Sequence, residues 1–345
     1  MTAILLVGAG AVGRRAARQL AETEGVGRIL LTDAVAERAE AVAEYLGGMA
    51  EAVKWNPADA LPAGVAAVAA AVDGASERVI AERALEAGVP LACCSDDNES
   101  VRGLLDLDDA AREAGVAVAA GCALAPGLSD VLARHAAGAL DRIDEVHVAR
   151  AGAGGLTCVQ SVVRSTRGSL HEWRDGAWVR ERAWSGRQFV WFPAPVGGLD
   201  CHRAASAQAA LLVDAFPQLS RASMRVAAAG GEGFKIPGLR LPKVPLPSRR
   251  RDDDPDREWG AVWVEVRGRR GRSEEILVYG AVDRMAFAAG AVLAQSVAWL
   301  AGLGPSPPVQ TGVHGLAALV DPVPFLSELA RRGVKAAVFE GADGL

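Results

Sequence analysis

The chain has 345 residues, 50% of them hydrophobic and 23% charged, which is typical of a folded globular protein and excludes disorder over its whole length. The formal net charge of -5 argues against nucleic acid or an anionic membrane surface as a partner, because both attract proteins through a basic excess. The five cysteines form no spaced CxxC pair and no signal segment precedes the first strand, so we expect no disulfide framework, no metal site and a cytoplasmic location.

From Ile4 to Gly121, short apolar runs alternate with alanine-rich amphipathic stretches. This rhythm is typical of parallel strands joined by crossover helices, and it predicts an α/β fold whose N-terminal domain is a doubly wound, Rossmann-type parallel sheet. The predicted strands are Ile4–Val7, Arg28–Thr32, Ala52–Trp55, Val65–Val72, Val89–Cys93 and Val116–Ala120. The predicted helices are Val12–Glu22, Ala36–Leu46, Ser76–Glu86 and Leu105–Ala114.

A glycine-rich turn joins the first predicted strand to its helix. Gly8, Gly10 and Gly13 form GxGxxG, in which the first glycine permits the tight turn, the second admits a pyrophosphate and the third lets helix and strand pack closely. Asp33 ends the second strand, where a carboxylate binds both ribose hydroxyls and repels a 2′-phosphate, so NAD is favoured over NADP. The cofactor residues predicted in this unit are Gly8, Gly10, Ala11, Val12, Gly13 and Asp33.

Two further polar loops follow predicted strands at the same end of the sheet. Ligands of parallel α/β sheets bind at the carboxyl ends of the strands, which places Asp73 and Ser95 beside the cofactor. Asp96 and Asp97 extend the second loop, and two adjacent carboxylates either orient a substrate ammonium or are ordinary solvated loop residues. Arg38 lies too deep in its helix to be assigned to a phosphate.

After Pro126 the pattern changes to longer alternating strands, which predicts a second, α+β domain with a mixed sheet. Its clearest hairpin, Leu170–Trp184, turns at Asp175 and Gly176. The proline-rich, charged segment 235–258 predicts an excursion away from the sheet. The other predicted elements are the helix Gly127–Leu140, the strands Trp259–Val266 and Glu274–Val282, the apolar helix Arg284–Leu303, the helix Phe325–Arg332 and the strand Val334–Phe339.

The segment GCALAPGLSD, from Gly121 to Asp130, resembles the element with which the saccharopine dehydrogenase family crosses between its two domains. Three other stretches agree with that family, nearest to its lysine epsilon-dehydrogenase branch: GSLHEWRDGAWVRE, GGLDCHRAASAQAALLVDAFPQL and TGVHGLAALVDPVPFLSELARRGV. The resemblance implies a dinucleotide domain at 1–125, a substrate-binding and dimerisation domain at 126–283 and C-terminal helices at 284–345 that return to the first domain. It also implies a homodimer.

The resemblance further implies NAD-dependent oxidoreduction at a carbon–nitrogen bond of a small amino acid, amine or imine. Such chemistry needs a group that removes a proton from nitrogen. His202 stands where relatives carry a histidine, with Asp200 close by, so both are candidate catalytic residues together with Asp96. Arg203 is a candidate clamp for a substrate carboxylate, with Asp97 as a second binding residue.

Two alternatives keep the same fold and cofactor. The first is reduction of a carbon–oxygen or carbon–carbon double bond, and the second is a non-catalytic protein that senses NAD(H). The loop ACCSDDNES departs from the pattern of relatives, which leaves the substrate open. The tryptophans at positions 173, 178, 184, 191, 259 and 263 either pack the second sheet, which is the favoured interpretation, or line a substrate pocket.

Overall fold

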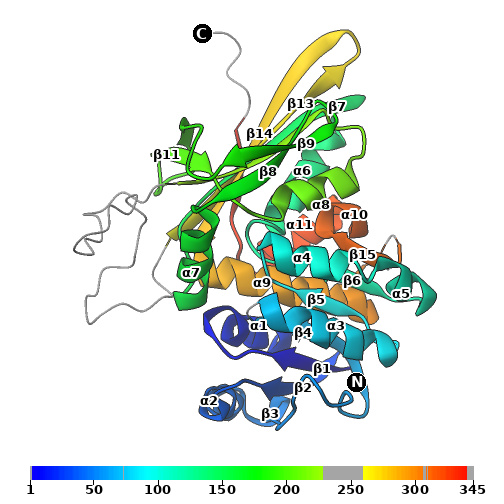
Figure 1. The fold of residues 1–345 in the computed structure, drawn as a ribbon. Helices are drawn as coiled ribbons and strands as arrows, with labels where there is room; N and C mark the ends of the chain where they lie inside the picture. The colour runs from blue at the N-terminus through cyan, green and yellow to red at the C-terminus, as the bar shows by residue number, and fades with distance from the viewer. Residues whose placement is uncertain (1, 73, 228–258, 306–307, 309, 340–345) are drawn as a thin grey trace.

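The computed structural model describes residues 2–72, 74–227, 259–305, 308 and 310–339, which form two sheets separated by a layer of helices (Figure 1). The first sheet has the strand order β15-β6-β5-β4-β1-β2-β3, and every described pairing in it is parallel. The prediction of a doubly wound parallel sheet is confirmed. Its strands are β1 (Thr2–Val7), β2 (Val26–Thr32), β3 (Ala50–Ala52), β4 (Val65–Ala70), β5 (Leu91–Cys93), β6 (Ala117–Ala120) and β15 (Gly312–Gly315).

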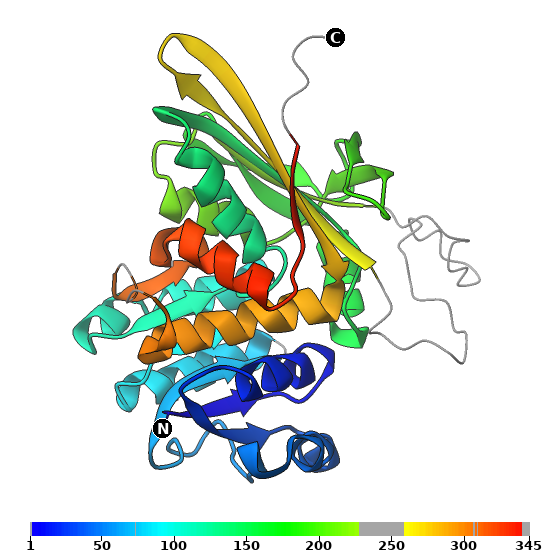
Figure 2. The same cartoon turned by 180° about the vertical axis from the view of Figure 1, so that it is seen from behind.

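Helices cover both faces of this sheet, which explains why its strands read as unbroken apolar runs. Alternate side chains of β1 enter two hydrophobic clusters, one shared with α1 and α9 and the other shared with α3 and α4. Figures 1 and 2 show these two helix layers from opposite sides. The helices of this domain are α1 (Ala11–Ala21), α2 (Ala36–Leu46), α3 (Glu77–Glu86), α4 (Asn98–Leu105) and α5 (Asp108–Glu113), and α9 (Met285–Ala298) joins them from late in the chain.

Two predicted elements of this domain differ from the structure. The helix predicted at Leu105–Ala114 corresponds to α5, and the structure has a further helix, α4, before that range. Asp97 starts α4 by accepting hydrogen bonds from the backbone N–H groups of Glu99 and Ser100. The strand predicted at Ala52–Trp55 ends at Ala52. Trp55 therefore lies in the loop that follows β3.

The second sheet is mixed, as predicted, with the order β10-β11-β12-β7-β13-β14-β16 and a further hairpin, β8 and β9, attached to β12. The pairing of β12 with β7 is parallel, and the other described pairings are antiparallel. Its strands are β7 (Arg142–Ala151), β8 (Ser169–Arg174), β9 (Ala177–Arg182), β10 (Gln188–Trp191), β11 (Gly198–Arg203), β12 (Arg221–Ala227), β13 (Trp259–Arg270), β14 (Ser273–Arg284) and β16 (Ala336–Phe339). Its helices and those beside it are α6 (Leu128–Ala137), α7 (Leu156–Ser165), α8 (Gln208–Ala215), α10 (Leu316–Leu319) and α11 (Pro322–Arg331).

Helix α9 is the apolar helix predicted near the end of the chain, and it lies between the two sheets (Figure 2). The stretch Met285–Leu303 has the length and composition of a membrane span, but 72% of its apolar window is buried inside the protein. A side chain at Gly290 would lie 2.5 Å from the Cβ atom of Arg15, so this glycine lets α9 pack closely on α1. The helix is therefore part of the core.

The C-terminal part of the chain contributes to both sheets. Strand β15 extends the first sheet beside β6, whereas β16 pairs with β14 of the second sheet. The sequence predicted that residues 284–345 return to the first domain. Strand β16 instead joins the second sheet, because the edge strand β14 offers unpaired backbone hydrogen-bonding groups. The segment 235–258, predicted as an excursion, lies outside the described residues.

A fully buried carboxylate lies where the chain crosses between the domains. Asp130, on α6, has no solvent exposure, and burial raises its pKa to about 7 although hydrogen bonds from Gln208, Gly127 and Ser129 oppose that shift. In the unfolded chain such a carboxyl ionises near its ordinary value of 3.8. The folded state therefore loses stability as the pH rises between these two values.

Replacing Asp130 with Asn is expected to remove this pH dependence. At pH 8 the native carboxylate is ionised in the core, which destabilises the native protein but not the variant. The unfolding free energy of the variant minus that of the native protein is therefore expected to be larger at pH 8 than at pH 4, by up to about 4 kcal/mol. Urea unfolding of both proteins across this range measures the difference. A constant difference between native protein and variant at all pH values would contradict the assignment.

Candidate functional site

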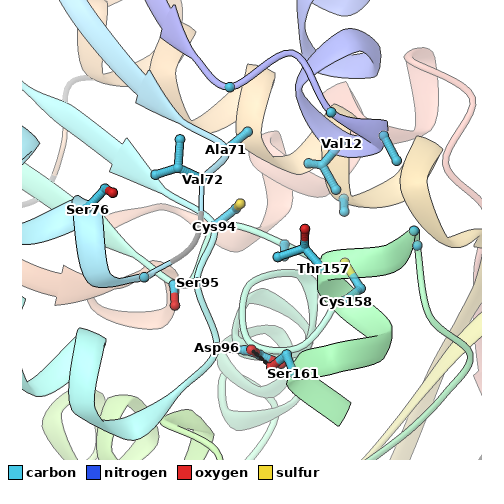
Figure 3. Close-up of a pocket in the computed structure, with 18 of the residues that line it drawn as sticks. Val12, Ala71, Val72, Ser76, Cys94, Ser95, Asp96, Thr157, Cys158 and Ser161 are labelled. Carbon is cyan, nitrogen blue, oxygen red and sulfur yellow. Dashed lines mark hydrogen bonds between the residues drawn. The ribbon is translucent and has the colours of Figure 1, made fainter. Parts of the chain in front are cut away.

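A cavity of about 610 Å³ lies at the carboxyl ends of the central strands of the first sheet, and it is also lined by residues of the second domain. The strand order reverses between β1 and β4, which is where parallel α/β sheets bind their ligands. Figure 3 shows residues after β4 and β5 on one side of this cavity and α7 on another. The two domains build it together.

The glycine-rich turn has the geometry that its sequence predicts. Gly8 has a φ of +98°, and a Cβ there would lie 2.3 Å from the carbonyl oxygen of Ala71. A Cβ at Gly13 would lie 1.8 Å from the carbonyl oxygen of Gly8, so only glycine permits this contact between helix and strand. Gly10 lines the cavity, and a Cβ on it would have no described atom within 4 Å. A side chain at Gly10 would therefore point into open space.

Asp33 lies at the next strand end and is held by the backbone. Its Oδ2 atom accepts a hydrogen bond from the N–H of Ala9 at 2.7 Å, and its Oδ1 atom accepts one from Val35 at 2.8 Å. Arg38 lies 3.8 Å from the same carboxylate and lines the cavity, which corrects the view that it lies too deep in α2 to reach a ligand. Trp55 and its neighbouring loop line this end too.

These residues fit a dinucleotide. The open space in front of Gly10 leaves room for a pyrophosphate. The amino end of α1 supplies backbone N–H groups that can bind it. The Asp33 carboxylate lies where a ribose would extend from it. Of the predicted cofactor residues, Gly8, Gly10, Ala11, Val12, Asp33 and Ser95 line the cavity, Gly13 supports the turn, and Asp73 lies outside the described residues.

At the other end of the cavity, the carboxylate of Asp96 follows β5. Its Oδ2 atom lies 2.6 Å from a guanidinium nitrogen of Arg150, on β7. Its Oδ1 atom accepts a hydrogen bond at 2.6 Å from the hydroxyl of Ser161, on α7, and Figure 3 shows these two side chains together. The side chains of Asp96 and Arg150 are 17% and 11% exposed. The pair is therefore shielded from bulk water, where it would be weak.

Asp97 also lines the cavity but has a different role in the structure. Its Oδ1 atom accepts the two N–H bonds that start α4, at 3.0 and 3.1 Å, and its Oδ2 atom accepts hydrogen bonds from the hydroxyls of Ser95 and Ser100. The backbone N–H of Ser95 in turn donates to the buried Glu77. We therefore assign Asp97 to the helix cap rather than to the substrate.

The structure does not bring the two other predicted catalytic residues, His202 and Asp200, or the predicted substrate clamp, Arg203, to this cavity. His202 stacks on Trp184 at 4.4 Å, and burial lowers its pKa. Asp200 forms an ion pair with Arg187 at 2.9 Å. The third residue, Arg203, binds the buried carboxylate of Glu172 at 3.3 Å. None of these three is among the described residues that line the cavity.

Sequence reasoning missed the residues that the second domain contributes. Arg150, Thr157, Cys158 and Ser161 line the cavity, and Cys94 faces it from the end of β5 (Figure 3). Burial raises the pKa of the Cys94 and Cys158 thiols, so both are neutral at physiological pH. The sequence offered one signal for these residues, since positions 157, 158 and 161 recur on one face of a helix. Only the fold shows that this helix faces the glycine-rich turn.

The six tryptophans of the second domain do not line the cavity, whereas Trp55 of the first domain does. Trp178, Trp191 and Trp259 are 46%, 65% and 45% exposed, so the prediction that these rings form a buried packing face is wrong for them. Trp173 is partly buried and donates a hydrogen bond to the carbonyl of Leu219. Trp184 contacts His202.

Comparison with solved structures places the fold among dehydrogenases. Saccharopine dehydrogenase (L-Glu forming) of Saccharomyces cerevisiae superposes with a TM-score of 0.65 over 99% of this chain and 100% of that chain, at 13% identity. An amine dehydrogenase of Mycobacterium smegmatis superposes with a TM-score of 0.50 over 93% of this chain and 96% of that chain, at 11% identity. No protein-family model and no curated protein sequence matches the chain. The resemblance noted in the sequence thus extends to the fold, which is similar to that of saccharopine dehydrogenase.

Proposed function

We propose that the protein is an NAD-dependent oxidoreductase that acts on a carbon–nitrogen bond of an amino acid, amine or imine. The observation that carries this proposal is the carboxylate of Asp96 in the substrate end of a dinucleotide cavity. NAD, when bound, accepts a hydride from the substrate carbon. A cytoplasmic location and a homodimer are expectations from the sequence.

The side chains around the substrate end favour nitrogen chemistry. Asp96 can pair with a substrate ammonium and accept one proton from it, which frees the nitrogen lone pair to form the C=N bond as the hydride leaves carbon. An alcohol substrate offers a carboxylate only a hydrogen bond, and its oxidation calls for a stronger base. The described residues that line the cavity include no histidine, lysine or tyrosine that would serve as that base.

A substrate screen tests the proposal. The purified protein is mixed with NAD and, separately, L-lysine, L-glutamate, n-butylamine and the matching alcohols, and NADH absorbance is followed. In the reverse direction, NADH is mixed with aldehydes or oxo acids in the presence of ammonium or an amino acid. Turnover of alcohols or of ketones without a nitrogen donor would instead support reduction of C=O bonds. Tight NAD(H) binding without turnover of any compound would support a sensing protein.

The choice between NAD and NADP is expected to depend on Asp33. The native protein should bind NAD at least about tenfold more tightly than NADP, because the carboxylate accepts the ribose hydroxyls and repels a 2′-phosphate. Asp33→Asn keeps the shape but removes the charge, so its NADP affinity should rise, aided by Arg38 on the same side of the cavity. Titration of both cofactors by protein fluorescence measures the ratio.

Glu37→Gln is the matched control, because Glu37 lies on the same helix as Arg38 but is exposed and outside the described cavity lining. It should leave the ratio of NAD to NADP affinity unchanged. Equal affinities in the native protein, or an unchanged ratio in Asp33→Asn, would show that Asp33 does not select the cofactor.

A further inference from the structure

Asp96 lies on a loop of the first domain, but its described partners come from three separate segments of the second domain. Arg150 of β7 and Ser161 of α7 each bind one carboxylate oxygen at 2.6 Å. The backbone carbonyl of Asp96 accepts a hydrogen bond from the N–H of Ala207, directly before α8, at 2.9 Å. The position of this carboxylate is thus fixed by contacts across the domain boundary.

Arg150 is itself held in place at its other end. Its Nη1 atom donates to the carbonyl oxygen of Ala125 at 2.9 Å, in the segment that crosses between the domains, while Nη2 contacts Asp96. The guanidinium is planar, so these two contacts fix the direction from which it approaches the carboxylate. With the side chain 11% exposed, the ion pair lies in surroundings of low dielectric, where a charge-assisted contact is strong.

We infer that Arg150 and Ser161 are positioning residues that hold the Asp96 carboxylate at the reacting nitrogen, so that the active site is complete only while the two domains are docked. This inference rests on the proposed function. Neither residue needs to touch the substrate, because both act through Asp96. If Arg150 instead bound a substrate carboxylate, its substitution would raise KM, and its effect would be independent of a substitution at Asp96.

A double-mutant cycle separates these two roles. The substrate is the member of the amine screen with the highest turnover. Arg150→Met is expected to lower kcat about 100-fold with KM changed less than about threefold, because misplacing a catalytic group costs rate and leaves binding intact. Arg150→Lys keeps the charge and is expected to recover part of that loss. Ser161→Ala, which removes one hydrogen bond, is expected to lower kcat about 3- to 10-fold.

In the Asp96→Asn background, adding Arg150→Met should slow turnover by no more than about twofold, because its target has already been removed. Arg142→Met is the matched control: Arg142 lies on the same strand, is 63% exposed and pairs with Asp144 at the surface. It should retain native kcat and KM. NAD affinity should be native in every variant, which verifies that each one is folded.

Three results would overturn the inference. They are a rise in KM alone for Arg150→Met, fully multiplicative effects of Arg150→Met and Asp96→Asn, and native kcat in both Arg150→Met and Ser161→Ala. If Arg150→Met fails to bind NAD, Ser161→Ala takes its place in the cycle. Adding Ser161→Ala to Asp96→Asn should then slow turnover little further, whereas fully multiplicative effects of these two substitutions would overturn the inference. A native rate for Asp96→Asn alone would instead refute the proposed role of Asp96, which is a separate failure.

Discussion

Asp96→Asn is expected to lower kcat for amine oxidation by about 10²- to 10⁴-fold, which is the usual contribution of a positioned general base. Asparagine keeps the size of the side chain and can still accept the hydrogen bond from Ser161, but it can neither take a proton nor pair with an ammonium. The loss should therefore appear in kcat, while NAD affinity stays native. Steady-state NADH formation and a separate NAD titration measure the two quantities.

The neighbouring carboxylate provides the comparison for this variant. Asp97→Asn should retain kcat within about threefold, because Asp97 caps α4 and asparagine is an equally good cap. The two substitutions differ by one position and make the same chemical change. A larger loss of kcat in Asp97→Asn than in Asp96→Asn would show that the wrong one of the two carboxylates has been assigned to catalysis.

Gly10→Val is expected to weaken NAD binding by about 100-fold or more, equivalent to roughly 3 kcal/mol, without lowering the melting temperature. A Cβ at this position would meet no described atom within 4 Å and would point into open space, so we expect the folded protein to accommodate the valine. The same side chain would fill the space where the pyrophosphate approaches the backbone N–H groups at the start of α1. Calorimetric titration with NAD and a thermal unfolding scan check both parts.

Gly13→Ala gives the contrasting result. Its Cβ would lie 1.8 Å from the Gly8 carbonyl oxygen, so α1 must move away from β1, and both stability and NAD affinity should fall. The pair of variants distinguishes a glycine needed by the ligand from one needed by the fold. Unchanged NAD affinity in Gly10→Val would mean that the cofactor does not approach this turn.

Much of the first domain could be predicted from the sequence, because the residues that determine its elements are close together in the chain. The GxGxxG turn and Asp33 act within one βαβ unit, where strand, turn and helix are adjacent in the chain. The boundaries of α2 agree with those predicted, since its apolar positions follow the helical period and Gly47 ends it. The prediction gave no bounds for α4, whose start depends on the side chain of Asp97 as a cap.

Placement of the second domain against the first could not be predicted in this way. His202 was chosen as a catalytic residue because it stands where relatives carry a histidine. Arg203 was chosen as a substrate clamp because it is close to His202 in sequence and its guanidinium suits a carboxylate. The fold gives both residues partners of their own, Trp184 and Glu172. Arg150 carried no local signal, because an arginine in an alternating strand is usually a solvent-facing residue. Its function depends on which loop the folded sheet places opposite it.

By itself, therefore, the sequence determined the glycine-rich turn, the position of Asp33 at the end of β2 and the parallel sheet that presents them, all of which follow from short-range periodicity and backbone conformation. Only the tertiary structure decided which side chains surround Asp96 at the proposed substrate end of the cavity. The hydrogen bond from Ser161 to Asp96 joins residues 65 positions apart, and the Arg150 ion pair likewise bridges the domain boundary. Such contacts arise when two independently patterned sheets dock, and no local sequence pattern encodes which of their side chains meet.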